Sequence, residues 1–143
     1  MSISARNIFE GTVSALTHGA VNAEVSITTA GGDTIVAIVT EASLKALDLA
    51  TGKPAVALFK APWVILVADE APYAFSARNQ LAGEVTAITR GAVNAEVSLK
   101  LAGGATVHAV VTLDAVSELN LAVGKKATAL IKASHIVVGT PRA

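Results

Sequence analysis

An internal repeat constrains the fold of this chain more than any other feature of its sequence. A shift of 72 positions aligns residues 4–67 with residues 76–139 of the 143-residue chain without a gap. Roughly half of the aligned positions are identical, and residues 19–26 recur unchanged as residues 91–98. The boundary lies in a short charged stretch that ends at Pro72, so we predict two copies of one domain, at residues 1–70 and 71–143.

Each copy has the sequence pattern of a small β-domain. Apolar residues at positions 23, 25 and 27 alternate with polar ones, which is typical of a half-buried strand. Two adjacent glycines then suit a hairpin turn before the apolar run 35–39, and further strands are expected at 55–59 and 64–68. Thr40 can cap a short helix over residues 41–47. The pattern predicts an all-β chain of two tandem OB-like five-stranded antiparallel barrels, each with one short helix.

Composition narrows the class of protein. The net charge is zero and aromatic residues make up 3% of the chain, which disfavours duplex and single-stranded nucleic acid as partners. There is no cysteine, no long apolar run that predicts a membrane span, and no secretory signal pattern at the N-terminus, so we expect a cytoplasmic protein. Only 15% of residues are charged against 52% hydrophobic, and we expect the resulting apolar surface to be covered in an obligate oligomer.

The polar residues that both copies share are mostly hydrogen-bond donors. Arginine recurs at 6 and 78, and lysine at 60 and 132, whereas no catalytic triad, paired carboxylates or phosphate-binding loop is present. An oxyanion without protons offers only acceptors, so a site for it should contain only donors. We therefore expect a protein that binds a small tetrahedral oxyanion such as molybdate, tungstate or sulfate, and we do not expect an enzyme.

Four motifs, in order and duplicated, resemble the Mop (TOBE) domain of molbindins. They are Ser-Ala-Arg-Asn at the domain start, Gly-Ala-Val-Asn-Ala-Glu-Val in mid-domain, Thr-x-x-Ser after the strand at 35–39, and Lys-Ala in a late strand. The resemblance covers essentially the whole chain and is greatest to the two-Mop-domain molbindins (the ModG type). It implies storage of molybdate or tungstate without an organic cofactor, in a homo-oligomer that we expect to be a trimer.

The resemblance implies one class of site between subunits. The Ser-Ala-Arg-Asn element would come from one chain, and the Thr-x-x-Ser and Lys-Ala elements from its neighbour. The implied ligands are Ser4, Arg6, Asn7, Thr40, Ser43, Lys60 and Ala61 in the first copy, and Ser76, Arg78, Asn79, Thr112, Lys132 and Ala133 in the second. Ala115 replaces the hydroxyl of Ser43, so we expect the second site to be weaker.

A second implied class of site lies on the three-fold axis of a trimer, where small residues let backbone N–H groups approach an anion. Its residues would be Gly19, Ala20, Val21 and Asn22 in one copy, and Gly91, Ala92, Val93 and Asn94 in the other. His18 precedes the first loop where Arg90 precedes the second. If both face the axis, binding at the His18 layer should weaken as pH rises through the titration of histidine.

Several simpler interpretations stay open at this point. Thr40 suits a helix cap whether or not it binds an anion, the two lysines could be solvated, and Glu24 and Glu96 suit a solvated or intersubunit strand face. For the whole chain, the alternatives are the effector module of a molybdate-responsive regulator or transporter, and a nucleic-acid-binding OB barrel. The two repeats leave no room for a helix-turn-helix or a nucleotide loop, which favours storage.

Overall fold

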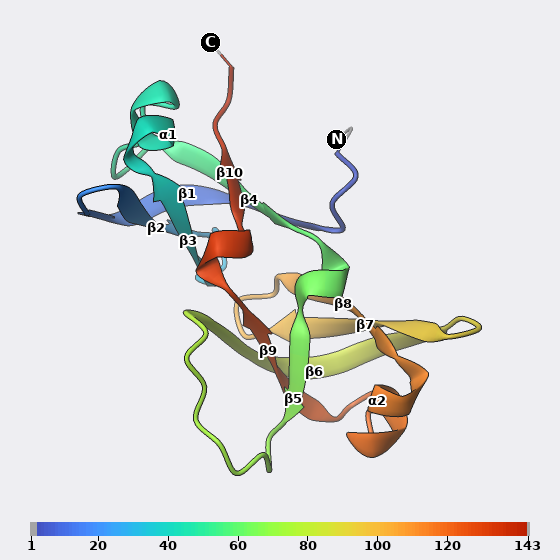
Figure 1. Ribbon diagram of the computed structural model, residues 1–143. Helices are drawn as coiled ribbons and strands as arrows, with labels where there is room; N and C mark the ends of the chain where they lie inside the picture. Colours follow the sequence, from blue (N-terminus) through green and yellow to red (C-terminus); the bar gives the residue numbers. More distant parts are fainter. Residues whose placement is uncertain (1–2, 143) are drawn as a thin grey trace.

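A computed structural model of the chain describes residues 3–142 and consists of two curled five-stranded antiparallel sheets. Figure 1 shows the two sheets packed side by side, each with a short helix at its outer end. The first half contains β1 (Asn7–His18), β2 (Asn22–Thr28), β3 (Thr34–Thr40), α1 (Glu41–Ala46), β4 (Pro54–Phe59), the 3₁₀ turn η1 (Ala61–Trp63) and β5 (Ile65–Ala68). The second half contains β6 (Asn79–Arg90), β7 (Asn94–Leu101), β8 (Thr106–Thr112), α2 (Leu113–Glu118), β9 (Lys126–Ile131), the 3₁₀ turn η2 (Ala133–His135) and β10 (Val137–Gly139).

The predicted fold class is confirmed: the chain is all-β, with two antiparallel five-stranded units and one short α-helix in each. Helix α1 begins after Thr40, whose side chain accepts a hydrogen bond from the Ser43 backbone N–H, as the capping pattern predicts. Its equivalent Thr112 caps α2 in the same way. Leu44 is buried and fixes the inner face of α1 against the core.

The two sheets exchange their last strands. Strand β5 pairs with β9 of the second sheet, and β10 pairs with β4 of the first (Figure 1). The sequence repeat contains no signal for this exchange, because a strand has the same apolar pattern whichever sheet it completes. Each sheet thus needs a strand from the other half of the chain. The division into domains at residues 1–70 and 71–143 remains a proposal that describes the repeat in the sequence.

The long strands β1 and β6 curl each sheet. Each pairs with β4 or β9 along its first half and with β2 or β7 along its second half. A register shift interrupts the pairing between Val13 and Ala15, and an equivalent one between Val85 and Ala87. Such bulges bend a strand and increase its twist, which lets one strand belong to both sides of a barrel.

One hydrophobic cluster runs through both halves. It contains the inward residues of the alternating strands, among them Val25, Ile27 and Ile35, all completely buried. Phe9 and Phe59 stack in the first half with ring centroids 5.7 Å apart. The continuous core and the exchanged strands make the two repeats a single packed unit.

Equivalent parts of the two repeats meet each other directly, as expected near a pseudo-two-fold axis. The rings of Trp63 and His135, which occupy equivalent positions, lie 5.2 Å apart. The two hairpin turns also meet: a Cβ added to Gly31 would lie 1.9 Å from the Gly103 carbonyl oxygen, so only glycine fits there. Asp33 joins these turns by accepting hydrogen bonds from the backbone N–H groups of Gly103 and Ala105, at 2.9 and 3.0 Å.

Candidate functional site

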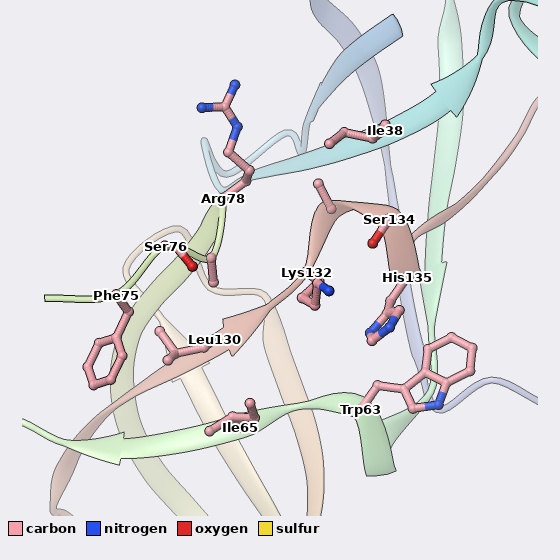
Figure 2. Close-up of a pocket in the computed structure, with 12 residues that line it drawn as sticks. Ile38, Trp63, Ile65, Phe75, Ser76, Arg78, Leu130, Lys132, Ser134 and His135 are labelled. Carbon is pink, nitrogen blue, oxygen red and sulfur yellow. The ribbon is translucent and has the colours of Figure 1, made fainter. Parts of the chain in front are cut away.

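A cavity of about 450 Å³ gathers much of the predicted donor set of the second repeat. Figure 2 shows it between the segment before β6, the end of β9 and the exchanged strand β5. Its walls combine donors with apolar side chains of both repeats. The lining residues are Ile38, Trp63, Ile65, Phe75, Ser76, Ala77, Arg78, Leu130, Lys132, Ala133, Ser134 and His135.

The structure brings Ser76, Arg78, Lys132 and Ala133 together within one chain, whereas the resemblance implied that the Lys-Ala element would come from a neighbouring chain. The first two come from the segment before β6 and the last two from the junction of β9 and η2. Ser76, Arg78 and Lys132 are exposed, whereas Ala133 is buried and closes the floor. The Ser76 hydroxyl and the Lys132 ammonium are donors that suit an acceptor-only anion, whereas the Arg78 guanidinium points away from the cavity in Figure 2 and pairs with Glu24.

The segment that carries Ser76 and Arg78 is held from both sides. Gln80 donates to the carbonyl oxygens of Phe75 and Ala77 through its side-chain amide, at 2.8 and 3.1 Å. Asn79 anchors the other side and is 1% exposed. The backbone between these two anchors presents the Arg78 side chain to the surface.

Asn7 and Asn79, both predicted as ligands, use their side chains to join the two repeats. The Asn7 amide accepts from the His108 N–H and donates to the His108 carbonyl oxygen, at 2.7 and 2.8 Å. Asn79 makes the same pair of bonds to Val36 and a further one to the Ile131 carbonyl oxygen. Both amides are buried and have hydrogen-bond partners on the edge strand of the opposite repeat, so they place the neighbouring arginines.

The predicted arginines form ion pairs across the two repeats. Arg6 Nε lies 2.7 Å from Glu96 Oε1 on β7, and Arg78 pairs with Glu24 on β2. The hydrogen bond to Glu96 raises the pKa of Arg6, which remains a cation throughout the physiological range. Sequence analysis placed Glu24 and Glu96 on a solvated or intersubunit strand face and did not predict these ion pairs; their identical recurrence beside a donor-rich set was the available signal.

The remaining predicted residues of this class lie at exposed strand and helix ends. Thr40 donates to Ser43 Oγ at 2.9 Å while capping α1. Lys60 precedes η1 as Lys132 precedes η2, Ala61 is buried like Ala133, and Ser4 is exposed ahead of β1. Of the residues that the structure describes, Thr112 is not one that lines the cavity of about 450 Å³.

The two predicted axial loops are exposed at all four positions, Gly19, Ala20, Val21 and Asn22 in one copy and Gly91, Ala92, Val93 and Asn94 in the other. Figure 1 shows these loops, β1–β2 and β6–β7, at opposite edges of the molecule. Their hydrogen bonds differ. Glu41 accepts from the Gly19 N–H and lies 3.0 Å from the His18 ring, whereas the Gly91 N–H donates to the Asn94 carbonyl oxygen. The hydrogen bond with His18 lowers the pKa of Glu41.

Large apolar side chains are exposed at equivalent positions of the two repeats. Val21 and Val93 are each 71% exposed at the loop tips, and Ile65 and Val137 on the exchanged strands are 59% and 57% exposed. Within residues 3–142, no cluster of three or more His, Asp or Glu side chains could hold a metal ion. The described helices are all too short to cross a membrane.

Comparison with known proteins decides the family. A family model described as the TOBE domain matches the chain twice, at residues 3–66 and 76–138. This chain belongs to the TOBE-domain family. The tandem TOBE protein is 55% identical to the cytoplasmic molybdate-binding protein ModG, whose structure with molybdate bound superposes with a TM-score of 0.93, covering 99% of this chain and 100% of that one.

Curated relatives of this TOBE protein carry molybdenum-related names. It is 46% identical over 138 residues to the molybdenum transport protein ModE of Herbaspirillum seropedicae, covering 96% of this chain and 51% of ModE. It is 43% identical over 141 residues to the molybdenum-pterin-binding protein MopA of Rhodobacter capsulatus, covering 99% of this chain and 53% of MopA. The chain thus spans about half the length of the curated relatives it matches.

Proposed function

We propose that this TOBE protein binds molybdate, and tungstate by the same donor chemistry, for intracellular storage or homeostasis and without catalysis. The observation that carries the proposal is the convergence of Ser76, Arg78, Lys132 and Ala133 on one cavity. The 55% identity to a molybdate-binding protein over the whole chain supports the same assignment. That relative is described as cytoplasmic, which supports a cytoplasmic location for this protein too.

The chemistry of the donor set favours an unprotonated dianion. Molybdate, tungstate and sulfate carry no proton at neutral pH and offer only acceptors, whereas phosphate retains a proton that needs an acceptor. Hydrogen bonds from charged donors contribute about 1.5–3 kcal/mol each in general, so a few of them hold a dianion tightly. Among the cavity residues, Arg78 and Lys132 are charged donors and Ser76 is a neutral one.

We propose that the sites are completed by neighbouring subunits of a homotrimer. The cavity is open, and its apolar wall includes Trp63 and Ile65, which are 41% and 59% exposed. A second chain covering this wall would bury apolar surface and could bring the hydroxyl of Thr112 or Thr40 to the anion. The first-repeat site would use Ser4, Arg6, Thr40, Ser43, Lys60 and Ala61, with Asn7 and Asn79 as positioning residues.

The axial sites of such a trimer would use residues 19–22 and 91–94. The exposure of both loops in one chain supports their availability to other copies. The His18 layer should bind anions more weakly as pH rises, since only a protonated imidazole adds a positive charge. An unchanged pH dependence of binding in His18→Ala would contradict this role.

A second candidate function is the ligand-sensing module of a regulator or transporter. The match to ModE over half of that protein's length favours it. A sensing module should change its assembly or partner binding with molybdate, whereas a store should keep one assembly. Solution mass with and without molybdate separates the two functions.

Calorimetric titration of the full chain with molybdate, beside a solution mass measurement, tests the proposal. Sulfate and phosphate serve as control anions. We expect a trimer. The intersubunit sites alone would take up about two molybdate ions per chain, and each axial site is shared among three chains. Uptake of more than about two ions per chain would therefore show that both site classes are used. Absence of heat with molybdate would contradict the proposed function.

A further inference from the structure

His108 distinguishes the surroundings of Arg6 from those of Arg78. It lies on β8 at the position that Val36 occupies on β3. Its Nδ1 atom is 3.0 Å from Ser98 Oγ and 3.8 Å from Glu96 Oε1. That same Glu96 oxygen accepts the hydrogen bond from Arg6 Nε at 2.7 Å. One carboxylate oxygen therefore faces both a permanent cation and a titratable ring.

The backbone keeps His108 in this position. Asn7, next to Arg6, forms two hydrogen bonds with the His108 main chain, at 2.7 and 2.8 Å. A displacement of the segment that contains Arg6 would therefore also move the backbone of His108. The side chain of His108 is 23% exposed and that of Glu96 is 30% exposed, so the interaction between them is only partly screened by water.

Burial and charge both act on the ring. Burial lowers the pKa of His108, the neighbouring Arg6 lowers it further, and Glu96 partly opposes them by raising it. Both burial and Arg6 therefore favour the neutral form of the His108 ring. Among the other elements that pack against β8, η1 and β5 contain no charged residue. The remaining titratable groups on or beside these elements are Glu10 on β1, Asp33 in the β2–β3 turn, Lys60 before η1, Lys100 on β7, and Asp114 and Glu118 on α2.

We propose that Glu96 competes with the oxyanion for Arg6, and that His108 regulates this competition by taking up a proton. This inference rests on the proposed function. With His108 neutral, Glu96 stays on Arg6 and occupies the guanidinium. When the ring is protonated, its Nδ1–H donates to Glu96, the carboxylate moves toward the ring, and Arg6 is released to bind the anion. The Arg6 site should thus bind more tightly as the pH falls and the ring takes up a proton.

The second repeat is a built-in control. Arg78 pairs with Glu24 just as Arg6 pairs with Glu96, and Asn79 holds the Val36 main chain just as Asn7 holds that of His108. Valine cannot take up a proton, so the Arg78 site should lack this pH response. The two sites then respond differently to acidification in the same molecule.

Ring titration of the full chain by NMR, with and without saturating molybdate, tests the proposal at the residue itself. The chain has three histidines, and His108→Val identifies the His108 signals. Because linkage is reciprocal, a proton that strengthens anion binding must have its pKa raised by the anion. We expect the pKa of His108 to rise on saturation in the wild type, and Glu96→Gln to remove most of that rise. An unchanged pKa, or a rise of the same size in Glu96→Gln, would overturn the proposal.

Site-specific affinities complete the test. Arg78→Ala removes the second-repeat site, so the remaining response belongs to the Arg6 site. Lowering the pH from 7.5 to 5.5 should increase the molybdate affinity of Arg78→Ala by about three- to five-fold more than that of Arg78→Ala/His108→Val. This effect is near the low end of typical coupling. Because both variants are compared at the same pH values, any protonation of molybdate itself affects them equally and does not contribute to the difference. In the Arg6→Ala background, Val36→His should introduce the same response at Arg78. Equal pH dependence with and without His108 contradicts the inference alone, whereas no heat at any pH contradicts the proposed function as well.

Discussion

The two repeats share most of their donors and differ at several positions where they meet or titrate. Both retain the Ser-Ala-Arg-Asn element, the buried asparagine and the arginine–glutamate pair. They differ at Val36 and His108, at Asp33 and Ala105, at Glu41 and Leu113, and at Ser43 and Ala115. The comparison indicates that duplication preserved one donor geometry while the surroundings of each site came to differ.

The largest difference we expect between equivalent substitutions is at the buried asparagines. Asn79→Ala removes three hydrogen bonds and leaves the backbone N–H and carbonyl of Val36 without their side-chain partner, whereas Asn7→Ala removes two. Unpaired buried polar groups cost about 1–3 kcal/mol each, so we expect Asn79→Ala to lower the free energy of unfolding by about 2–4 kcal/mol, and Asn7→Ala by less. Urea unfolding of both variants checks the order. Equal losses would show that the third bond is not significant.

A smaller effect is expected at the turn that only one repeat uses as a clamp. Asp33→Ala removes two hydrogen bonds to the turn of the second repeat, and we expect a loss of about 1–2 kcal/mol because the site is only part-buried. The double variant Asp33→Ala/Ala105→Asp moves the carboxylate to the equivalent position. Thermal unfolding should show partial recovery if the two turns are related by pseudo-symmetry, and no recovery if they are not.

The hydroxyl difference should change affinity by a few-fold. Ser43→Ala removes a hydroxyl from the first-repeat set and Ala115→Ser adds one to the second, while the caps at Thr40 and Thr112 keep their backbone hydrogen bonds. A neutral hydrogen bond corresponds to about a two- to ten-fold change in affinity. Calorimetry with molybdate should show weakening in the first variant and strengthening in the second. Changes in the same direction would exclude the hydroxyl as the cause.

The smallest expected difference is in the pH dependence of stability. The pKa of folded His108 lies below its unfolded value, so its neutral form contributes stability above the unfolded pKa that is lost as pH falls through the folded pKa. His108→Val should therefore flatten the decline in stability on acidification from pH 7, while Val36→Ala leaves it unchanged. Unfolding curves at a series of pH values check this, and an unaltered slope in His108→Val would contradict it.

Much of the fold could be predicted because the period-two alternation, the paired glycines and the Thr40 cap are local signals. The strand exchange could not, since β5 and β10 carry the same apolar pattern in either sheet. For the site, the duplicated motifs included Ser76, Arg78, Lys132 and Ala133, and these four residues line one cavity. The hydrogen bonds of Asn7 and the partners of the arginines depend on contacts between residues 54 to 101 positions apart, which no local pattern records.

The most direct test of two non-equivalent anion sites is molybdate titration of the full chain beside Arg6→Ala, Arg78→Ala and the double variant. We predict that each single variant loses about one site per chain in a trimer and keeps the other class, while the double variant retains only the shared axial sites. A wild type that binds no molybdate, or single variants that lose nothing, would contradict the account.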